Sequence, residues 1–427
     1  MAEAAPPPHT IIKGGRILNP ATHLDCVGDV VLRDGLVAAV GPGVGDALLA
    51  SIPPGDSITV NVFNATGLLV CPGLIDMHVH AYTHATELGV DLDATCLAKG
   101  VTTAVDAGSA GASTLAGLRL LVAAKARTRL LAFVNLCLHG LASAGCSGGD
   151  NTGGELDSLN QLSVKACRQA VAANPGFAVG VKLRLSADIA DGGRNEAEAY
   201  ARAREAAAGV PLMVHHTFST VPLDGDAGCP SAMKAGDILT HALHGYPSTI
   251  IDTDTSTVHR AVLDAAARGV VMDVGHGQGS FNWRTAELCG EAGFWPNVVS
   301  TDLHTGNSSG PAYDLVTVCT KLLHVGMGLE AVIRAVTATP AAVLGMSDTL
   351  GSLEVGREAD VSVLSVEDVD VDLEDCQGFV RRVKRRMKAV AVWRAGVPAD
   401  IVDGPWPNPD CVAQRDMAHL LVVKQEP

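Results

Sequence analysis

Two histidines separated by a single residue, His78 and His80, give the clearest chemical signal in the sequence. They end an apolar segment at residues 73–80 that reads GLIDMHVH and has the character of a buried strand. Because residues two apart in a strand project to the same side, both imidazoles can bind one metal ion. Two ordinary histidines at the end of a strand would give the same pattern, so this motif alone indicates a metal site only weakly.

Further polar residues end other apolar segments and strengthen the metal interpretation. Lys182 lies within the apolar segment 180–184 (GVKLR), where a charged amine would be costly unless it is paired or neutralised. The remaining members of this set are His215 and His216, His241 and His244, and Asp302 and His304. Active sites of α/β barrels form at the C-terminal ends of several strands. A shared metal centre therefore explains the placement of all these residues.

The segments that must position these residues alternate along the middle of the chain. Short β-branched runs alternate with Ala-rich stretches, such as residues 196–209 and 258–268, in a rhythm typical of βα units. The predicted strands are Leu68–His80, Val101–Ser109, Leu130–Gly140, Ala178–Ser186, Val210–Phe218, Asp237–Gly245, Gly269–Gly277 and Asn297–His304. Eight strands over roughly 280 residues predict a (β/α)₈ TIM barrel of the α/β class.

The two ends of the chain have a different pattern. Ile11–Leu18 and Asp29–Val40 near the N-terminus alternate apolar and polar residues, as do Gly351–Ser365 and Val383–Gly396 near the C-terminus. These segments predict a small β-sandwich beside the barrel. The predicted domains are the first part of the sandwich at 1–66, the barrel at 67–347, the second part of the sandwich at 348–403 and a C-terminal tail at 404–427.

Composition excludes several classes of partner. The net charge of −15 argues against a nucleic-acid partner, because no cationic field exists to neutralise phosphates. No uninterrupted apolar run has membrane-spanning length, and the first residues lack the pattern of a secretory signal. The 11 cysteines are scattered and never form a CxxC pair, which favours a reducing compartment. We therefore expect a cytoplasmic enzyme with a small-molecule substrate, without nucleic acid or membrane as partner.

Three segments taken together resemble the amidohydrolase superfamily, and within it the dihydroorotase-like deacetylase branch. Residues 12–20 (IKGGRILNP) resemble the opening strand of that family's sandwich. Residues 72–80 (PGLIDMHVH) are similar to its metal signature, and residues 351–360 (GSLEVGREAD) resemble the segment that returns to the sandwich. The resemblance covers residues 10–400 and implies a barrel with a binuclear metal centre.

The resemblance implies a role for each polar strand end. The implied metal ligands are His78, His80 and Asp302 for one divalent ion, and His215 and His241 for the other. Lys182 would be carboxylated by carbon dioxide and bridge both ions, which also removes the cost of burying an ammonium group. His215 is preferred over His216 because alternation along a strand points the two side chains to opposite faces. Histidine and carboxylate ligands favour zinc as the metal.

The resemblance also implies the reaction. A hydroxide bridging the two metals would hydrolyse an N-acetyl or N-acyl amide, or an acetyl ester, of a small carboxylate-bearing compound, with Asp302 as the catalytic proton carrier. Arg184 should face the same side as Lys182, where it can bind a substrate carboxylate or form a structural ion pair. Three further residues are candidates for substrate binding from their positions: His276, which could instead have a loop role, His304, which could instead be a surface histidine, and Gly310, which is expected to shape the pocket. Asp106 and Asp273 are interpreted as structural.

Two alternative functions remain open. A cyclic amidase, such as a dihydroorotase or hydantoinase, shares the metal ligands and differs in its substrate loops. A non-catalytic scaffold homologue would have lost its ligands, yet all six ligand residues are present in this sequence. A homo-oligomer is expected only by analogy with such enzymes.

Overall fold

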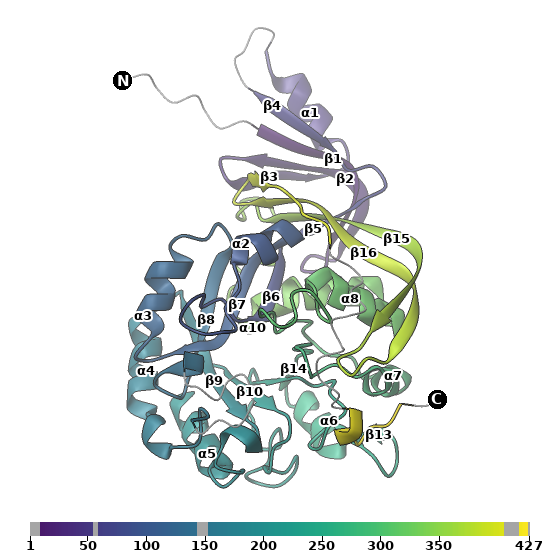
Figure 1. The fold of residues 1–427 in the computed structure, drawn as a ribbon. Coiled ribbons are helices and arrows are strands. Elements are labelled where there is room, and N and C mark those ends of the chain that lie inside the picture. The colour runs from purple at the N-terminus through teal and green to yellow at the C-terminus, as the bar shows by residue number, and fades with distance from the viewer. Residues whose placement is uncertain (1–8, 54–58, 143–152, 405–417, 426–427) are drawn as a thin grey trace.

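The computed structural model describes residues 9–53, 59–142, 153–404 and 418–425. In these residues a parallel barrel lies beside a mixed sheet that is built from both ends of the chain (Figure 1). Most of the predicted C-terminal tail, at 405–417 and 426–427, lies outside the described residues. The chain therefore has the predicted class of fold, a TIM barrel with an accessory sheet.

The barrel strands follow the predicted alternation of β and α segments. Seven strands are parallel, in the order β14-β11-β10-β9-β8-β7-β6. Their bounds are β6 (Leu74–Val79), β7 (Val101–Gly111), β8 (Arg129–Asn135), β9 (Ala178–Leu185), β10 (Leu212–His216), β11 (Ile238–Thr240) and β14 (Val271–Met272). Every residue of β6 and β7 is buried, as expected for parallel strands that are covered on both faces.

The eighth predicted strand, Asn297–His304, closes the barrel without a regular ladder. Two isolated parallel bridges join it to its neighbours, Asp273–Val298 on one side and Val79–Leu303 on the other. Asp302 has a left-handed backbone with φ 49°, a conformation that a continuous strand does not accommodate. The interruption therefore falls at a predicted metal ligand.

Helices lie on the outside of the barrel strands (Figure 1). Their bounds are α2 (Leu92–Thr95), α3 (Leu115–Gly117), α4 (Val164–Ala173), α5 (Glu196–Ala206), α6 (Arg260–Ala267), α7 (Trp283–Glu291), α8 (Leu315–His324), α9 (Leu329–Ala335) and α10 (Ala338–Val343). A short hairpin, β12 (Ile251–Asp252) and β13 (Thr257–Val258), precedes α6. Side chains of Asp91, Ser163, Asn282 and Asp314 accept backbone N–H groups at helix N-termini, which sets where α2, α4, α7 and α8 begin.

The mixed sheet joins the two ends of the chain. Its strands lie in the order β17-β16-β15-β5-β1-β2-β3, and β4 pairs with β1. Their bounds are β1 (His9–Asn19), β2 (Leu24–Arg33), β3 (Leu36–Gly41), β4 (Val60–Asn64), β5 (Leu69–Pro72), β15 (Val361–Glu374), β16 (Val380–Arg394) and β17 (Val397–Ala399), and helix α1 (Val44–Ser51) follows β3. The sheet has a core of its own that includes Ile17, Val70, Val363 and Trp393. Only Gly73 separates β5 from β6, so this sheet anchors the barrel strand that carries His78.

The hairpin of β15 and β16 extends from the mixed sheet along α8 toward α7 (Figure 1). Its tip is fixed to the barrel, because Lys321 Nζ on α8 donates a 2.6 Å hydrogen bond to the carbonyl of Glu374. Cys376 Sγ lies 3.4 Å from the carbonyl oxygen of His276, which follows β14. The accessory sheet therefore reaches the mouth of the barrel.

Membrane-spanning helices and cysteine pairing can both be examined in the described residues. Among the described residues, no helix combines the length and apolarity needed to cross a membrane. The nine cysteines in the same part of the chain are all free thiols, and eight of them are buried.

Candidate metal centre and substrate pocket

A cavity of about 520 Å³ opens at the C-terminal ends of the barrel strands, where active sites of this fold lie. All six predicted ligand residues line it, although they come from five separate segments of the chain. They are His78, His80, Lys182, His215, His241 and Asp302. The structure thus brings the predicted set together around one space.

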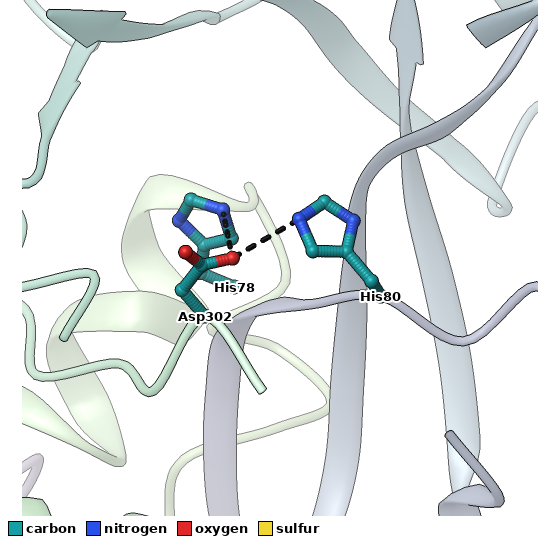
Figure 2. Close-up of side chains that lie close together, drawn as sticks. All are labelled: His78, His80 and Asp302. Atoms are coloured by element: carbon teal, nitrogen blue, oxygen red, sulfur yellow. Dashed lines mark ion pairs between the residues drawn. The ribbon is translucent and has the colours of Figure 1, made fainter. Parts of the chain in front are cut away.

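Three of these residues form a compact group. Asp302 Oδ1 lies 3.2 Å from His78 Nε2 and 3.0 Å from His80 Nε2 (Figure 2). One ligand atom from each residue lies within 4.8 Å of the others. Two imidazoles and one carboxylate at this spacing could hold a divalent metal ion.

The other three predicted ligands continue the group. Lys182 Nζ lies 3.3 Å from His78 Nε2. The ring centroid of His241 is 5.0 Å from that of His78 and 4.2 Å from that of His215. These side chains therefore form one continuous cluster with the His78, His80 and Asp302 group.

The adjacent histidines at the end of β10 point in different directions. His215 lines the cavity. His216 does not, and its Nε2 lies 2.9 Å from the carbonyl oxygen of Val221, to which it donates a hydrogen bond. This arrangement follows the alternation of side chains along a strand.

Hydrogen bonds fix the orientation of His241 and His80. His241 Nδ1 lies 2.6 Å from the Gly275 carbonyl, which can only accept, so the proton resides on Nδ1 and Nε2 is left with a lone pair. His80 Nδ1 lies 2.9 Å from Ser109 Oγ, which directs its Nε2 toward Asp302. Such outer contacts are typical of histidines that bind metals.

A chain of three polar residues orients His78. Thr240 Oγ1 donates a 2.7 Å hydrogen bond to Asp273 Oδ2, and Ser300 Oγ donates a 2.6 Å bond to Asp273 Oδ1. Because the Thr240 proton is committed to Asp273, the 2.9 Å contact between Thr240 Oγ1 and His78 Nδ1 requires the imidazole to donate. His78 Nε2 then carries the lone pair. Asp273, interpreted from the sequence as structural, thus acts on a predicted ligand.

The protonation states suit a cation. Burial lowers the pKa of His215 and His241 well below its usual value, which keeps both imidazoles neutral. Burial would raise the pKa of Asp302, but His78 and His80 lower it well below its usual value and keep it ionised. Burial also lowers the pKa of Lys182 to about 8, against the opposing effect of neighbouring carboxylates. Burial and Lys182 lower the pKa of His78, but Asp302 and Asp273 raise it above its usual value, so this imidazole would release a proton on binding a metal. Neutral imidazoles and an ionised carboxylate are the forms that bind metals, so the donor set fits a divalent cation.

Two of the predicted substrate contacts, Arg184 and His304, line the cavity. Arg184 Nη1 lies 3.9 Å from Glu155 Oε1, and its Nη2 lies 3.8 Å from Asp188 Oδ2. Both distances are too long for hydrogen bonds, so its guanidinium remains able to receive a carboxylate. His304 Nδ1 accepts a 3.0 Å hydrogen bond from the backbone N–H of Gly306.

The other two predicted contacts are not among the cavity-lining residues. His276 is fully buried, and its Nε2 lies 2.9 Å from Lys321 Nζ. Gly310 lies in the segment before α8, with φ 120°. Their roles in substrate binding remain predictions.

The cavity also contains residues that the sequence motifs did not identify. Glu155 lies in the connection between β8 and α4, and Cys376 comes from the tip of the β15–β16 hairpin. Neither belongs to a periodic segment or a motif. Their proximity to the ligands depends on long-range packing, for which the sequence has no local signal.

Comparisons with known proteins agree with this geometry. The model of a family described as "Amidohydrolase family" matches residues 69–398. A curated deacetylase of Agrobacterium fabrum is 33% identical over 352 residues, which cover 82% of this chain and 81% of the relative. A solved structure titled as an adenine deaminase has a TM-score of 0.79 and 28% identity, covering 92% of this chain and 100% of the other. One titled as a dihydroorotase has a TM-score of 0.78 and 28% identity, covering 92% and 98%.

Proposed function

Because this chain belongs to the amidohydrolase family, we propose that it is a metal-dependent deacylase of small carboxylate-bearing compounds. The bond it cleaves would be an N-acetyl or N-acyl amide, or an acetyl ester. One observation carries the proposal: six donor residues converge on a cavity that Arg184 also lines. Similarity to a curated deacetylase over 82% of the chain supports acyl hydrolysis.

We propose two divalent cations, zinc by preference, as the resident metals. His78, His80 and Asp302 would hold one cation, and His215 and His241 the other. Bound there, the cations would polarise the scissile carbonyl and lower the pKa of a water molecule to near neutrality.

We further propose that Lys182 is carboxylated. Its pKa of about 8 leaves part of the side chain as a neutral amine at neutral pH, and this form adds to carbon dioxide. A bond forms between Nζ and the carbon of carbon dioxide, and one amine proton passes to water. The anionic product would supply the remaining oxygen donors between the two groups of ligands.

Arg184 would bind the substrate, and Asp302 would transfer the proton. Arg184 would bind the substrate carboxylate through its planar donors and so place the acyl group beside Asp302. Water adds to the carbonyl carbon, and its proton passes to the carboxylate of Asp302. The bond to the leaving nitrogen or oxygen then breaks as Asp302 returns this proton to that atom. The products are a carboxylic acid and an amine or alcohol.

The test is an assay of N-acyl amino acids and acetylated hydroxy acids with the purified protein. We expect turnover that chelation abolishes and zinc restores, stoichiometric metal in the purified protein, and a mass increase of one carbon dioxide on Lys182 in native mass spectrometry. Purification without bound metal and without turnover would favour the scaffold alternative.

A cyclic amidase is the second candidate, and the likeness to a structure titled as a dihydroorotase supports it. This enzyme would use the same metal ligands on an amide within a ring. Rapid opening of dihydroorotate or a hydantoin, without turnover of the acyl compounds, would replace the first proposal with this one.

A further inference from the structure

Glu155 is a buried residue that is not among the proposed metal ligands. Its side chain is 1% exposed, and it lines the cavity together with Lys182 and Arg184. Neither of its oxygens has a hydrogen-bond partner among the described residues. Buried polar groups are nearly always hydrogen-bonded, because leaving one unpaired is costly. Glu155 is an exception to this rule and lies at the wall of the cavity, which indicates that a bound molecule supplies the hydrogen-bond donor.

The fold holds Glu155 in place through its neighbours. The backbone N–H of Leu156 donates a 2.9 Å hydrogen bond to the carbonyl of Ile189, in the segment after β9. The Asn195 side chain donates a 2.8 Å bond to the Leu156 carbonyl. Gly154, which precedes Glu155, also packs closely on Ile189. A Cβ added at Gly154 would lie 2.5 Å from the Cα of Ile189. The carboxylate is therefore presented to the cavity by a firmly anchored segment.

A donor group lies beside this acceptor. Arg184 Nη1 is 3.9 Å from Glu155 Oε1, so the two charges attract each other without forming a hydrogen bond. One wall of the cavity thus offers an uncommitted acceptor next to a cation.

We propose that Glu155 accepts a hydrogen bond from the amide N–H of the substrate and thereby favours N-acyl amino acids over the matching O-acyl hydroxy acids. The inference rests on the deacylase function proposed above. An N-acyl amino acid carries its carboxylate and its N–H on the same carbon, which matches the adjacent Arg184 and Glu155. The corresponding ester places an acceptor oxygen against the Glu155 carboxylate. Sites built to bind a substrate N–H discriminate strongly against analogues that lack it.

The test compares an N-acetyl amino acid with the O-acetyl hydroxy acid of the same side chain and configuration. Glu155→Leu should lower kcat/KM for the amide by roughly 10- to 100-fold, and for the ester by less than about threefold, because only the amide loses a hydrogen bond to a charged group. Glu155→Gln keeps an acceptor oxygen and should fall between wild type and Glu155→Leu. Asp188→Leu is the matched control, since Asp188 also faces Arg184 at 3.8 Å but is 55% exposed. This control should leave the amide-to-ester ratio as in wild type.

A measurement of thermal stability distinguishes a role of Glu155 in substrate recognition from a structural role. Glu155→Leu removes an unpaired buried carboxylate, so its thermal midpoint should equal or exceed that of wild type. Equal losses for amide and ester, or no loss for the amide, would overturn the inference while leaving the deacylase function intact. If Glu155→Leu does not fold, an unchanged ratio in Glu155→Gln overturns it. Absence of turnover of both substrates by wild type would instead refute the proposed function, and this inference with it.

Discussion

Asp302 Oδ1 lies 3.0 Å from His80 Nε2, so the carboxylate from the eighth barrel segment directly contacts a histidine from the first. Asp302→Asn preserves the size of the side chain but removes the charge and the proton acceptor. We expect kcat to fall roughly 10²- to 10⁴-fold, the usual loss when a proton carrier is removed. Kinetics on the best substrate and metal analysis of the same sample would measure it. Asp348→Asn, at a fully exposed carboxylate, should retain wild-type activity.

Gly277 supports Asp302 from the neighbouring segment. It has φ +60°, and a Cβ there would lie 2.8 Å from Asp302 Oδ2. Gly277→Ala should displace the carboxylate and reduce kcat/KM at least about tenfold, since small shifts of reacting groups are costly. Gly293→Ala is the matched control, because Gly293 has φ +67° with no atom within 4 Å of the added Cβ. That control should lower stability by about 1 kcal/mol through backbone strain and leave kinetics unchanged. Equal kinetics for both variants would contradict the prediction.

Asp273 should control metal affinity without binding the metal. Its Oδ2 accepts the Thr240 hydroxyl proton at 2.7 Å, and Thr240 in turn orients His78. Asp273→Asn would place an amide donor in this chain and favour the wrong imidazole tautomer. Loss of such an outer partner typically weakens metal binding by about 10- to 100-fold, which competition with a chelator would measure. An unchanged affinity would show that the orientation of His78 does not depend on Asp273.

The fold was predictable wherever local pattern determines structure. β7 is a run of buried small and β-branched residues, and β9 carries Lys182 inside an otherwise apolar strand, so both could be found from the sequence. Polar residues in or at the ends of such segments marked the candidates, and the resemblance to the amidohydrolase superfamily implied which six of them would be ligands. The eighth segment was expected as a strand and forms only two isolated bridges, because Asp302 leaves the extended conformation there.

The sequence was uninformative about residues that reach the cavity through long-range contacts. Cys376 arrives there on a hairpin from the accessory sheet, and Glu155 is placed by bonds between two barrel loops. The sequence does not distinguish Thr240 from other strand residues, because its role depends on the hydrogen bond that its hydroxyl donates to Asp273. Such roles follow from which segments become neighbours, and single-sequence periodicity contains no such information.

His216 should make folding stability depend on pH. It is 2% exposed, and burial lowers its pKa to about 4 in the folded protein. The pKa of a histidine in the unfolded chain is about 6.5. Below that pH the unfolded chain therefore binds a proton that the folded protein does not bind. The stability due to His216 is thus fully present above pH 6.5 and is lost as the pH falls toward 4, by about 3 kcal/mol in total.

His216→Gln isolates this contribution, because the amide can still donate to the Val221 carbonyl but does not titrate. Urea unfolding between pH 7 and pH 4 should show a smaller loss of unfolding free energy for this variant than for wild type, so wild type should lose stability relative to the variant as the pH falls. His419→Gln, at an exposed histidine, should follow the wild-type curve. Parallel curves for wild type and His216→Gln would mean that His216 is equally easy to protonate in both states, and that its burial does not oppose its charge.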